Sequence, residues 1–177
     1  MELYHDAAER ARAIRFLLLD VDGVLTDGTF WLREDGDEWK AFHATDGLGL
    51  RLLMDAGVPV ALLSGRRSAI VERRARELGI QRVVQGSSDK VAAIYELGTE
   101  LGVEPVEMAY MGDDLVDIPA MRVVGLAAAP ADARPEALAA AAWIAARGGG
   151  RGAVRDLCEH LLREMDGWDE VAARFQA

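Results

Sequence analysis

Two aspartates separated by one residue are the strongest chemical signal in the chain. Asp20 and Asp22 lie in the segment DVDGVLTDG, directly after the apolar residues 16–19. Open α/β sheets bind ligands at the carboxyl ends of their strands, so this run would deliver both carboxylates to a binding edge. Paired carboxylates can hold a hard divalent cation, and Gly23 would let the backbone turn sharply. The pattern indicates metal-assisted phosphate chemistry, although a strand-terminal turn with solvated carboxylates would have the same sequence.

Two further motifs place groups that suit a phosphate. Ser64 and Gly65, in ALLSGR, stand between an apolar run and a helical stretch, where a hydroxyl and free backbone N–H groups can bind phosphate oxygens. Lys90 begins another helical stretch, where a cation opposes the helix dipole unless an anion lies nearby. Taken singly, a helix N-cap and a surface lysine would explain these residues.

The segment MGDDLVD supplies three acids at a further predicted strand end, namely Asp113, Asp114 and Asp117. Like charges this close repel each other, and a shared cation would relieve the repulsion. Metal binding is therefore the economical explanation. For Asp114 and Asp117, a role beside the metal and a helix-capping role both remain open.

Short apolar runs alternate with helical stretches along the chain, an order typical of parallel strands joined by crossover helices. It predicts an α/β fold, a doubly wound Rossmann-like parallel sheet with helices on both faces, which would gather the motifs at one edge. The predicted strands are 16–21, 58–63, 82–85, 108–111, 123–126 and 143–145. The predicted helices are 48–56, 68–78, 90–101, 117–121, 135–140 and 153–165.

Residues 28–43 depart from this order. Two aromatic-rich runs flank the sequence DGD at 35–37, which predicts a β-hairpin. Because no repeat or linker divides the chain, we expect residues 1–177 to form one domain, with the hairpin at about 28–43 and a C-terminal tail at about 147–177. A two-stranded ribbon is not stable alone, so its aromatic side chains need a partner surface, on another subunit or on the same domain. These aromatic residues are Phe30, Trp31, Trp39 and Phe42.

Composition narrows the class of protein. The 177 residues carry a formal net charge of −10, which disfavours nucleic acid as a partner. The single cysteine, Cys158, excludes a disulfide framework and favours a reducing, cytoplasmic compartment. We expect no membrane association, because no stretch approaches the roughly 20 apolar residues of a membrane span and the first fifteen residues lack an apolar signal region.

Taken in order, DVDGVLTDG, LLSGR, Lys90 and GDDLVD resemble the four motifs of the haloacid dehalogenase superfamily of phosphotransferases. The similarity extends through KAFHATDGLG and RGGGRGAVRDLCEHLL, and so over residues 16–162. Within the superfamily, the chain most resembles the small phosphatases that act on 3-deoxy-D-manno-octulosonate 8-phosphate in lipopolysaccharide sugar synthesis. The resemblance implies a magnesium-dependent phosphatase of an acidic sugar phosphate.

The resemblance also implies a role for each motif residue. Asp20 would be the nucleophile that forms an aspartyl-phosphate, and Asp22 the general acid and then the base. Magnesium would bind between the Asp20 and Asp113 carboxylates, with the Asp22 backbone carbonyl as a further ligand. Ser64 and Lys90 would bind the oxygens of the transferring phosphoryl group, and Lys90 would also hold Asp20 ionised.

Access to the site follows from spacing. Forty-one residues separate Asp22 from Ser64 and 25 separate Ser64 from Lys90, which leaves no room for the cap domain that many members of the superfamily insert. Water exclusion and selectivity must then come from elsewhere, most simply from another subunit. The resembling family is tetrameric with its hairpins meeting at the centre, so the resemblance implies a homotetramer.

Four residues are candidates for binding the substrate: Asp46, Gly65, Arg66 and Arg151. A guanidinium can bind a sugar carboxylate in a bidentate manner, although surface charge would also explain both arginines. Asp46 could equally cap the helix predicted from residue 48. Arg151 belongs to the glycine-rich RGGGRG at 147–152, which by the resemblance approaches the active site of a neighbouring subunit. His43 stands where the family more usually has asparagine.

Two other functions are compatible with much of this pattern. One is a phosphatase of a nine-carbon acid, such as 2-keto-3-deoxynonulosonate 9-phosphate or a sialic acid 9-phosphate. Those relatives tend to carry glutamate at the position of Arg66 and lysine near Glu77, and this chain has neither. The other is a non-catalytic oligomerisation domain, which would not need the full set of motif residues.

Overall fold

The computed structural model describes residues 7–32, 34 and 38–176, which form a parallel sheet of six strands and a separate two-stranded ribbon. The strand order is β5-β4-β1-β6-β7-β8, so β1 pairs with β4 on one side and β6 on the other. The chain passes to the opposite side of β1 between β5 and β6, and open α/β sheets bind ligands at such a switch. The strands are β1 Phe16–Leu19, β4 Val60–Ser64, β5 Arg82–Gln85, β6 Met108–Met111, β7 Leu126–Ala129 and β8 Trp143–Ile144.

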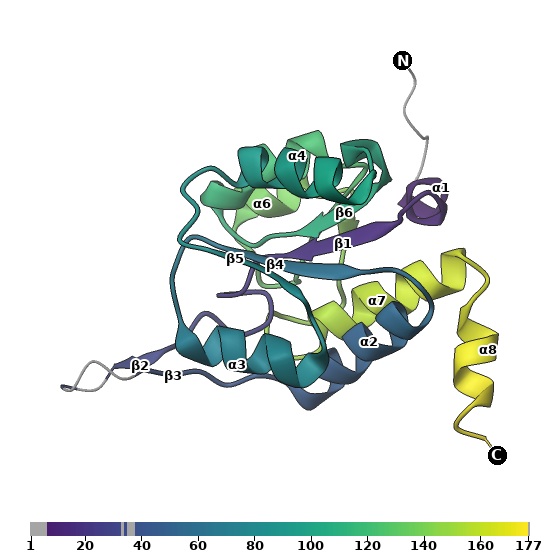
Figure 1. Ribbon diagram of the computed structural model, residues 1–177, viewed down its shortest axis with the longest axis horizontal. Helices are drawn as coiled ribbons and strands as arrows, with labels where there is room; N and C mark the ends of the chain where they lie inside the picture. The colour runs from purple at the N-terminus through teal and green to yellow at the C-terminus, as the bar shows by residue number, and fades with distance from the viewer. Residues whose placement is uncertain (1–6, 33, 35–37, 177) are drawn as a thin grey trace.

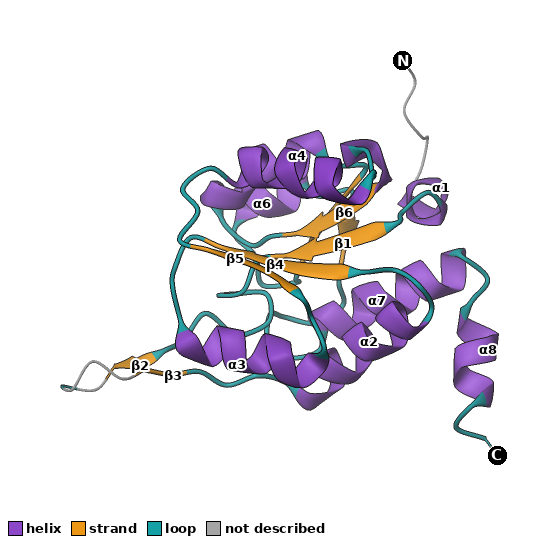
Figure 2. Ribbon diagram, viewed as in Figure 1, coloured by secondary structure: helices purple, strands orange, loops and turns teal. Residues whose placement is uncertain are grey.

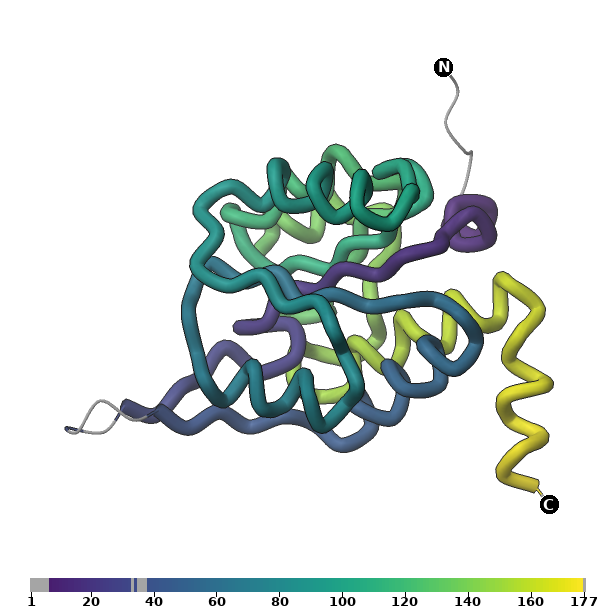
Figure 3. Tube along the Cα trace, viewed as in Figure 1, coloured from purple at the N-terminus to yellow at the C-terminus, as the bar shows by residue number. Residues whose placement is uncertain are grey.

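Helices cover both faces of the sheet, as Figures 1 and 2 show. α2, α3 and α7 pack on one face, and α4, α5 and α6 pack on the other. The short helices α1 and α8 lie at the end of the molecule opposite the ribbon (Figure 3). The predicted doubly wound α/β fold is confirmed. The helices are α1 Ala7–Arg12, α2 Ala44–Asp55, α3 Ala69–Leu78, α4 Lys90–Leu101, α5 Ile118–Val123, α6 Pro135–Ala140, α7 Ala153–Glu164 and α8 Trp168–Ala173, with 3-10 turns η1 Pro105–Glu107 and η2 Leu115–Asp117.

Burial of the sheet on both faces explains the continuous apolar runs of its strands. In β1, Leu17 and Leu19 pack in the cluster shared with α2 and α7, whereas Phe16 and Leu18 pack in the cluster shared with α4. A strand that is buried on two faces does not alternate apolar and polar residues. The polar side chains therefore begin where the strand ends, at Asp20.

Close packing of α2 against α7 corrects one predicted boundary. The helix that we expected from residue 48 begins at Ala44, although Gly47 and Gly49 weaken helix propensity. A Cβ on Gly49 would lie 2.9 Å from Cδ and 3.1 Å from Cα of Arg155 in α7, so glycine permits the two helices to approach. Tertiary packing thus outweighs local propensity in this segment.

A second boundary is also corrected, because the strand predicted at 123–126 is β7 at Leu126–Ala129. The residues before it form α5, whose proline near the first position suits a helix start. Most other predicted boundaries coincide with the observed ones and the rest differ by one or two residues, but the sequence analysis missed α1 and α8. None of the described helices is both long and apolar enough to cross a membrane.

The ribbon projects from the body of the molecule beside α3 (Figure 1). Its strands β2 Trp31–Leu32 and β3 Glu38–Trp39 are antiparallel, with Trp31 opposite Trp39, which confirms the predicted hairpin. Its predicted tip, Asp35, Gly36 and Asp37, lies outside the described residues. Trp31 and Trp39 are 71% and 63% exposed, whereas Phe42, the last of the four aromatic residues, packs against the core of its own domain. Between Asp22 and Ser64, the described residues form the ribbon, α2 and β4.

Candidate active site

A buried lysine holds the first aspartate of the motif. Asp20 follows the central strand β1, and Lys90 is the first residue of α4. Lys90 Nζ donates hydrogen bonds to Asp20 Oδ1 at 2.8 Å, to Asp117 Oδ1 at 2.6 Å and to the Tyr110 hydroxyl at 3.1 Å. Burial acts to lower the pKa of Lys90, but the two carboxylates outweigh it and raise that pKa, so the ammonium stays charged. Its three donors are all engaged by described residues.

Asp117 anchors this lysine and the loop after β6. It is fully buried, and its Oδ1 also accepts a hydrogen bond from the Tyr110 hydroxyl at 2.5 Å. Its Oδ2 accepts from the backbone N–H groups of Asp113 at 3.0 Å and Asp114 at 3.2 Å. Burial raises the pKa of Tyr110 well above its ordinary value, so the phenol remains a donor. Sequence analysis missed Tyr110. Its position could have indicated a role in the site, because it is a polar aromatic residue in the apolar strand that leads into the GDD motif.

Three carboxylates converge beyond the end of β1. Asp20, Asp113 and Asp117 each offer an oxygen atom, and these atoms lie within 4.8 Å of one another. Burial, partly offset by Lys90, raises the pKa of Asp20 to about 6. Burial and then the charge of Asp20 raise the pKa of Asp113 to about 7.

A divalent cation fits this group, because its charge would offset the burial penalty and the repulsion that raise both pKa values. Asp117 already accepts four hydrogen bonds, so Asp20 and Asp113 are the carboxylates available to a metal. A Cβ on Gly23 would lie 2.1 Å from Asp113 Oδ2, so only glycine allows this carboxylate to approach the DVDG turn. The Asp22 carboxylate, by contrast, is not part of this group.

Asp22 faces the ribbon. Its Oδ1 accepts a hydrogen bond from Lys40, which follows β3, and its Oδ2 lies 3.7 Å from Arg66 Nε. The Lys40 side chain is 0% exposed, and that of Asp22 is 18% exposed. Sequence analysis missed Lys40, because nothing near it in the sequence indicates its partner.

The predicted catalytic residues line one cavity of about 410 Å³ at the carboxyl edge of the sheet. The structure therefore brings Asp20, Asp22, Ser64, Lys90 and Asp113 together as the motif order predicted. Ser64 is buried, and its Oγ accepts a hydrogen bond from the backbone N–H of Arg66 at 3.2 Å. The other lining residues are Gly65, Arg66, Gly86, Ser87, Ser88, Asp114 and Val116.

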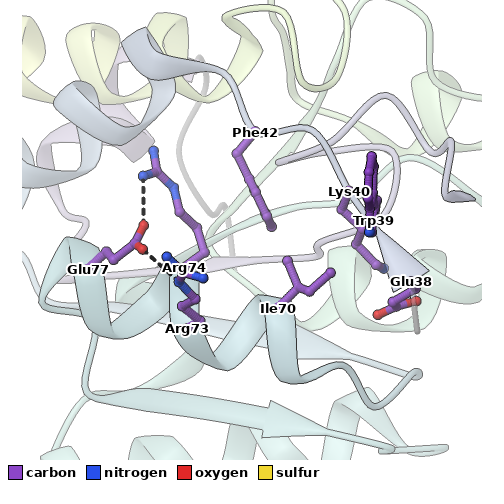
Figure 4. A pocket seen from close by; sticks show the side chains of 8 residues that line it. All are labelled: Glu38, Trp39, Lys40, Phe42, Ile70, Arg73, Arg74 and Glu77. Atoms are coloured by element: carbon purple, nitrogen blue, oxygen red, sulfur yellow. Dashed lines mark hydrogen bonds and ion pairs between the residues drawn. The ribbon is translucent and has the colours of Figure 1, made fainter. Parts of the chain in front are cut away.

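A larger cavity of about 530 Å³ lies between the ribbon and α3 (Figure 4). On its α3 side, Arg73 and Arg74 both pair with Glu77, at 3.1 and 3.5 Å. Size alone does not identify an active site. We assign the candidate site to the smaller cavity, because its carboxylates, ammonium and hydroxyl can together act on a phosphate.

The glycine-rich segment after β8 supports the motif loop. The backbone N–H of Gly150 donates to the Val24 carbonyl at 2.9 Å, and a Cβ on Gly149 would lie 1.8 Å from the Gly23 carbonyl oxygen. Only glycine permits this approach. Within the motif loop, the buried Thr26 hydroxyl accepts from the Gly23 N–H at 3.4 Å. The segment that we expected to reach a neighbouring subunit thus also serves its own domain.

The predicted contact of Asp46 with substrate requires a correction. Its carboxylate is buried away from the cavity, where it accepts hydrogen bonds from the N–H groups of Gly152 at 3.2 Å and Arg155 at 2.8 Å. Asp46 therefore caps the N-terminus of α7. It does not cap its own helix, which was the alternative.

Arg151 lies at the surface, whereas the C-terminal tail beyond it packs in the core, as the apolar stripe of the helix predicted at 153–165 indicates. Arg151 is 69% exposed and lies 3.4 Å from Asp27 Oδ2, outside the described lining of the cavity. The tail beyond it belongs to the core, because Leu157, Leu161 and Leu162 of α7 are buried against the sheet. Burial raises the pKa of the Cys158 thiol in the same helix, which leaves it a buried apolar side chain.

Comparison with known proteins identifies the family. Residues 31–125 match the family model described as haloacid dehalogenase-like hydrolase. The chain is also 45% identical over 161 residues to 3-deoxy-D-manno-octulosonate 8-phosphate phosphatase of Yersinia pestis, covering 91% of this chain and 86% of that protein. The chain belongs to the haloacid dehalogenase-like hydrolase family. The resemblance expected from the motifs is confirmed.

Other members of the family agree with this assignment. The phosphatase of the same name from Escherichia coli strain K12 is 43% identical, over 94% of this chain and 88% of that protein. The crystal structure of the Moraxella catarrhalis phosphatase, in complex with magnesium ion, phosphate ion and KDO, has a TM-score of 0.93 at 40% identity. It covers 96% of this chain and 97% of that one. The chain is a phosphoric monoester hydrolase of this family.

Proposed function

We propose that the chain is a magnesium-dependent phosphatase that converts 3-deoxy-D-manno-octulosonate 8-phosphate into the free sugar acid and phosphate. The observation that carries the chemistry is the buried Lys90–Asp20 pair at 2.8 Å, in a cavity that also holds Asp113 and Ser64. The choice of sugar is supported by the names of the relatives and by the KDO complex of the Moraxella protein. The reaction would serve lipopolysaccharide sugar synthesis in the cytoplasm.

In this mechanism Asp20 is the nucleophile. A carboxylate oxygen of Asp20 attacks phosphorus, the bond from phosphorus to the sugar oxygen breaks, and an aspartyl-phosphate forms. Lys90 holds Asp20 in place and ionised by its hydrogen bond to Oδ1. Lys90 has no spare donor in the described structure, so a direct bond to the phosphoryl group requires it to release one partner. The Tyr110 hydroxyl, at 3.1 Å, is the longest of the three contacts.

Asp22 acts first as the general acid and then as the general base. It gives a proton to the leaving sugar oxygen, and the resulting carboxylate then accepts a proton from water. That water attacks phosphorus, the acyl-phosphate bond breaks, and the Asp20 carboxylate and inorganic phosphate are released. The Ser64 hydroxyl and the Gly65 backbone line the same cavity and would bind phosphoryl oxygens.

Asp20 and Asp113 would hold the magnesium ion, with the backbone carbonyl of Asp22 as a third ligand. When bound, the ion neutralises repulsion between the nucleophile and the phosphate and stabilises the charge of the transition state. The raised pKa values of Asp20 and Asp113 support this assignment, because burial and neighbouring carboxylates disfavour both negative charges and a bound cation would stabilise them.

The assembly is part of the proposal. We propose one hydrolase domain over residues 1–177 that forms a homotetramer through its ribbons, because Trp31, Leu32 and Trp39 expose large apolar surfaces. The neighbouring subunit would exclude water from the open cavity. In such an assembly the exposed Arg151, and Arg66 at the rim of the cavity, are the candidates for binding the sugar carboxylate.

A panel of sugar phosphates tests this proposal. Phosphate release is measured with and without magnesium for the eight-carbon acid, the nine-carbon acids and neutral sugars. We expect magnesium-dependent release with preference for 3-deoxy-D-manno-octulosonate 8-phosphate. Preference for a nine-carbon acid would change the substrate, and no release from any member of the panel would favour the non-catalytic domain.

A further inference from the structure

We propose that Lys40 is a positioning residue that holds the Asp22 carboxylate at the rim of the cavity, where Asp22 exchanges a proton with the leaving oxygen. Lys40 follows β3 at the base of the ribbon. The inference rests on the proposed role of Asp22 as acid and base. It extends that role by assigning to the ribbon, besides assembly, the placement of a catalytic group.

The geometry around Asp22 is specific. Lys40 Nζ binds one carboxylate oxygen, and Arg66 Nε lies 3.7 Å from the other. Both cations pack on the ring of Phe30, with Lys40 Nζ at 5.5 Å and the Arg66 guanidinium carbon at 4.2 Å from its centroid. Arg66 also lies 3.6 Å from Glu38 of β3. Asp22 is thus held between the ribbon and the loop after β4.

The burial of Lys40 indicates that it is a partner of Asp22 and not an ordinary surface lysine. A buried ammonium is costly unless an opposite charge pairs with it. The Lys40 side chain is 0% exposed, and within the described part of the chain the carboxylate that pairs with it is Asp22. The Arg66 side chain is 47% exposed and so has room to turn toward a ligand, whereas the Lys40 side chain is enclosed by its surroundings.

Residue choice gives an independent observation. The chain contains eighteen arginines but only two lysines, Lys40 and Lys90. The two lysines bind the two aspartates of the DVD motif, Lys40 on Asp22 and Lys90 on Asp20. An ammonium is compact, whereas a guanidinium is planar and larger. Lysine therefore stands at the two buried positions where a cation must meet a motif carboxylate.

The functional test uses Lys40→Met, which keeps an unbranched side chain and removes the charge. For each protein, kcat/KM is measured with 3-deoxy-D-manno-octulosonate 8-phosphate and with 4-nitrophenyl phosphate. This parameter covers the steps up to departure of the leaving group, and only the sugar alkoxide needs a proton. We expect the ratio of sugar to aryl kcat/KM to fall about 10²-fold, the loss expected when a catalytic group is misplaced.

Two comparisons make the result specific. Arg73→Met removes a charge from the exposed surface of α3 and should leave the ratio unchanged. In an Asp22→Asn background, Lys40→Met should lower the ratio no further, because the group that it positions is already lost. An unchanged ratio in the single variant, an equal loss for both substrates, or a full additional loss in the double variant would each overturn the proposal.

A second measurement does not depend on activity. In protein labelled with ¹⁵N-lysine, the two side chains give two ammonium signals, which Lys40→Met assigns. Asp22→Asn should shift the Lys40 signal more than the Lys90 signal. A Lys40 signal that does not respond would overturn the contact. A wild-type protein without phosphatase activity would instead overturn the proposed function, and with it any part of Lys40 in proton transfer.

Discussion

Asp20 and Asp22 are two residues apart in the chain, yet different parts of the molecule hold them. The parallel sheet positions Asp20, which is buried after β1 and bonded to Lys90. The ribbon and the loop after β4 position Asp22, whose side chain remains partly exposed between Lys40 and Arg66. In the proposed mechanism, the group that would form the covalent bond is thus held by the core of the fold. The group that would protonate the leaving sugar is held by the ribbon and the loop after β4.

This difference separates two tasks. Attack on phosphorus is common to all substrates of such an enzyme, and a rigid, buried setting suits it. Proton transfer depends on the leaving group, and it takes place at the rim where the rest of the substrate must lie. Substitutions on the sheet side should therefore lower the turnover of all substrates. Substitutions on the ribbon side should lower turnover by an amount that depends on the leaving group.

The largest effect should come from Asp20→Asn. The amide keeps the shape of the side chain but loses the nucleophile, so turnover of sugar and aryl phosphates should both fall to background. Phosphate release and the melting temperature are measured together, and the fold should remain intact. Turnover close to that of wild type for either substrate would remove Asp20 from the mechanism.

Asp22→Ala should separate the two substrates. We expect kcat/KM for the sugar phosphate to fall roughly 10²- to 10⁴-fold, the usual contribution of a general acid, because an alkoxide leaves poorly without a proton. A nitrophenolate leaves unprotonated, so the aryl phosphate should lose far less. Equal losses for both substrates would contradict the distinction between the two sides of the site.

Asp113→Asn should change both metal binding and the pH dependence of stability. In the metal-free protein, the pKa values of Asp20 and Asp113 are raised from 3.8 to about 6 and about 7. The folded state then binds protons that the unfolded state has lost, so stability falls as pH rises from about 4 to 7. Asparagine at position 113 removes the part of this loss of stability that comes from Asp113. It also removes a carboxylate ligand, so magnesium should bind more weakly.

Melting temperatures of metal-free protein at pH 4.5 and pH 8 check this prediction. Without metal, the melting temperature of the variant should be higher than that of wild type at pH 8, but not at pH 4.5. Added magnesium should raise the melting temperature of wild type more at pH 8 than at pH 4.5. At pH 8, it should raise the melting temperature of the variant less than that of wild type. A variant that responds to magnesium as wild type does would show that Asp113 is not a ligand.

The smallest effect should come from Arg151→Ala. This exposed side chain lies outside the described lining of its own cavity, and in the proposed assembly it would act on the substrate of a neighbouring subunit. We expect about a tenfold loss of kcat/KM for the acidic sugar phosphate, the lower end of the value of one hydrogen bond to a charged group. Neutral sugar phosphates and the Arg163→Ala control should be unaffected, and an unchanged preference between acidic and neutral substrates would exclude Arg151 from recognition.

The same contrast explains how far sequence could predict the site. The order of apolar runs placed Asp20, Ser64 and Asp113 at strand ends, and parallel strands bring such ends to one edge. Lys40 was missed because its contact with Asp22, 18 residues away, depends on where the chain returns to the body after the ribbon. Asp46 was misassigned for a similar reason, since its partner Gly152 is 106 residues away and is reached only when α2 packs against α7.

Trapping the reaction in acid shows directly whether Asp20 becomes phosphorylated during turnover. The Asp22→Asn variant keeps the nucleophile but lacks the base, so it should accumulate the intermediate when it reacts with 4-nitrophenyl phosphate and magnesium. Quenching in acid and reduction with borohydride convert a phosphorylated aspartate into homoserine, which mass spectrometry locates. We expect homoserine at position 20 in close to one residue per chain. Release of nitrophenol without modification of Asp20, or modification at another aspartate, would contradict it.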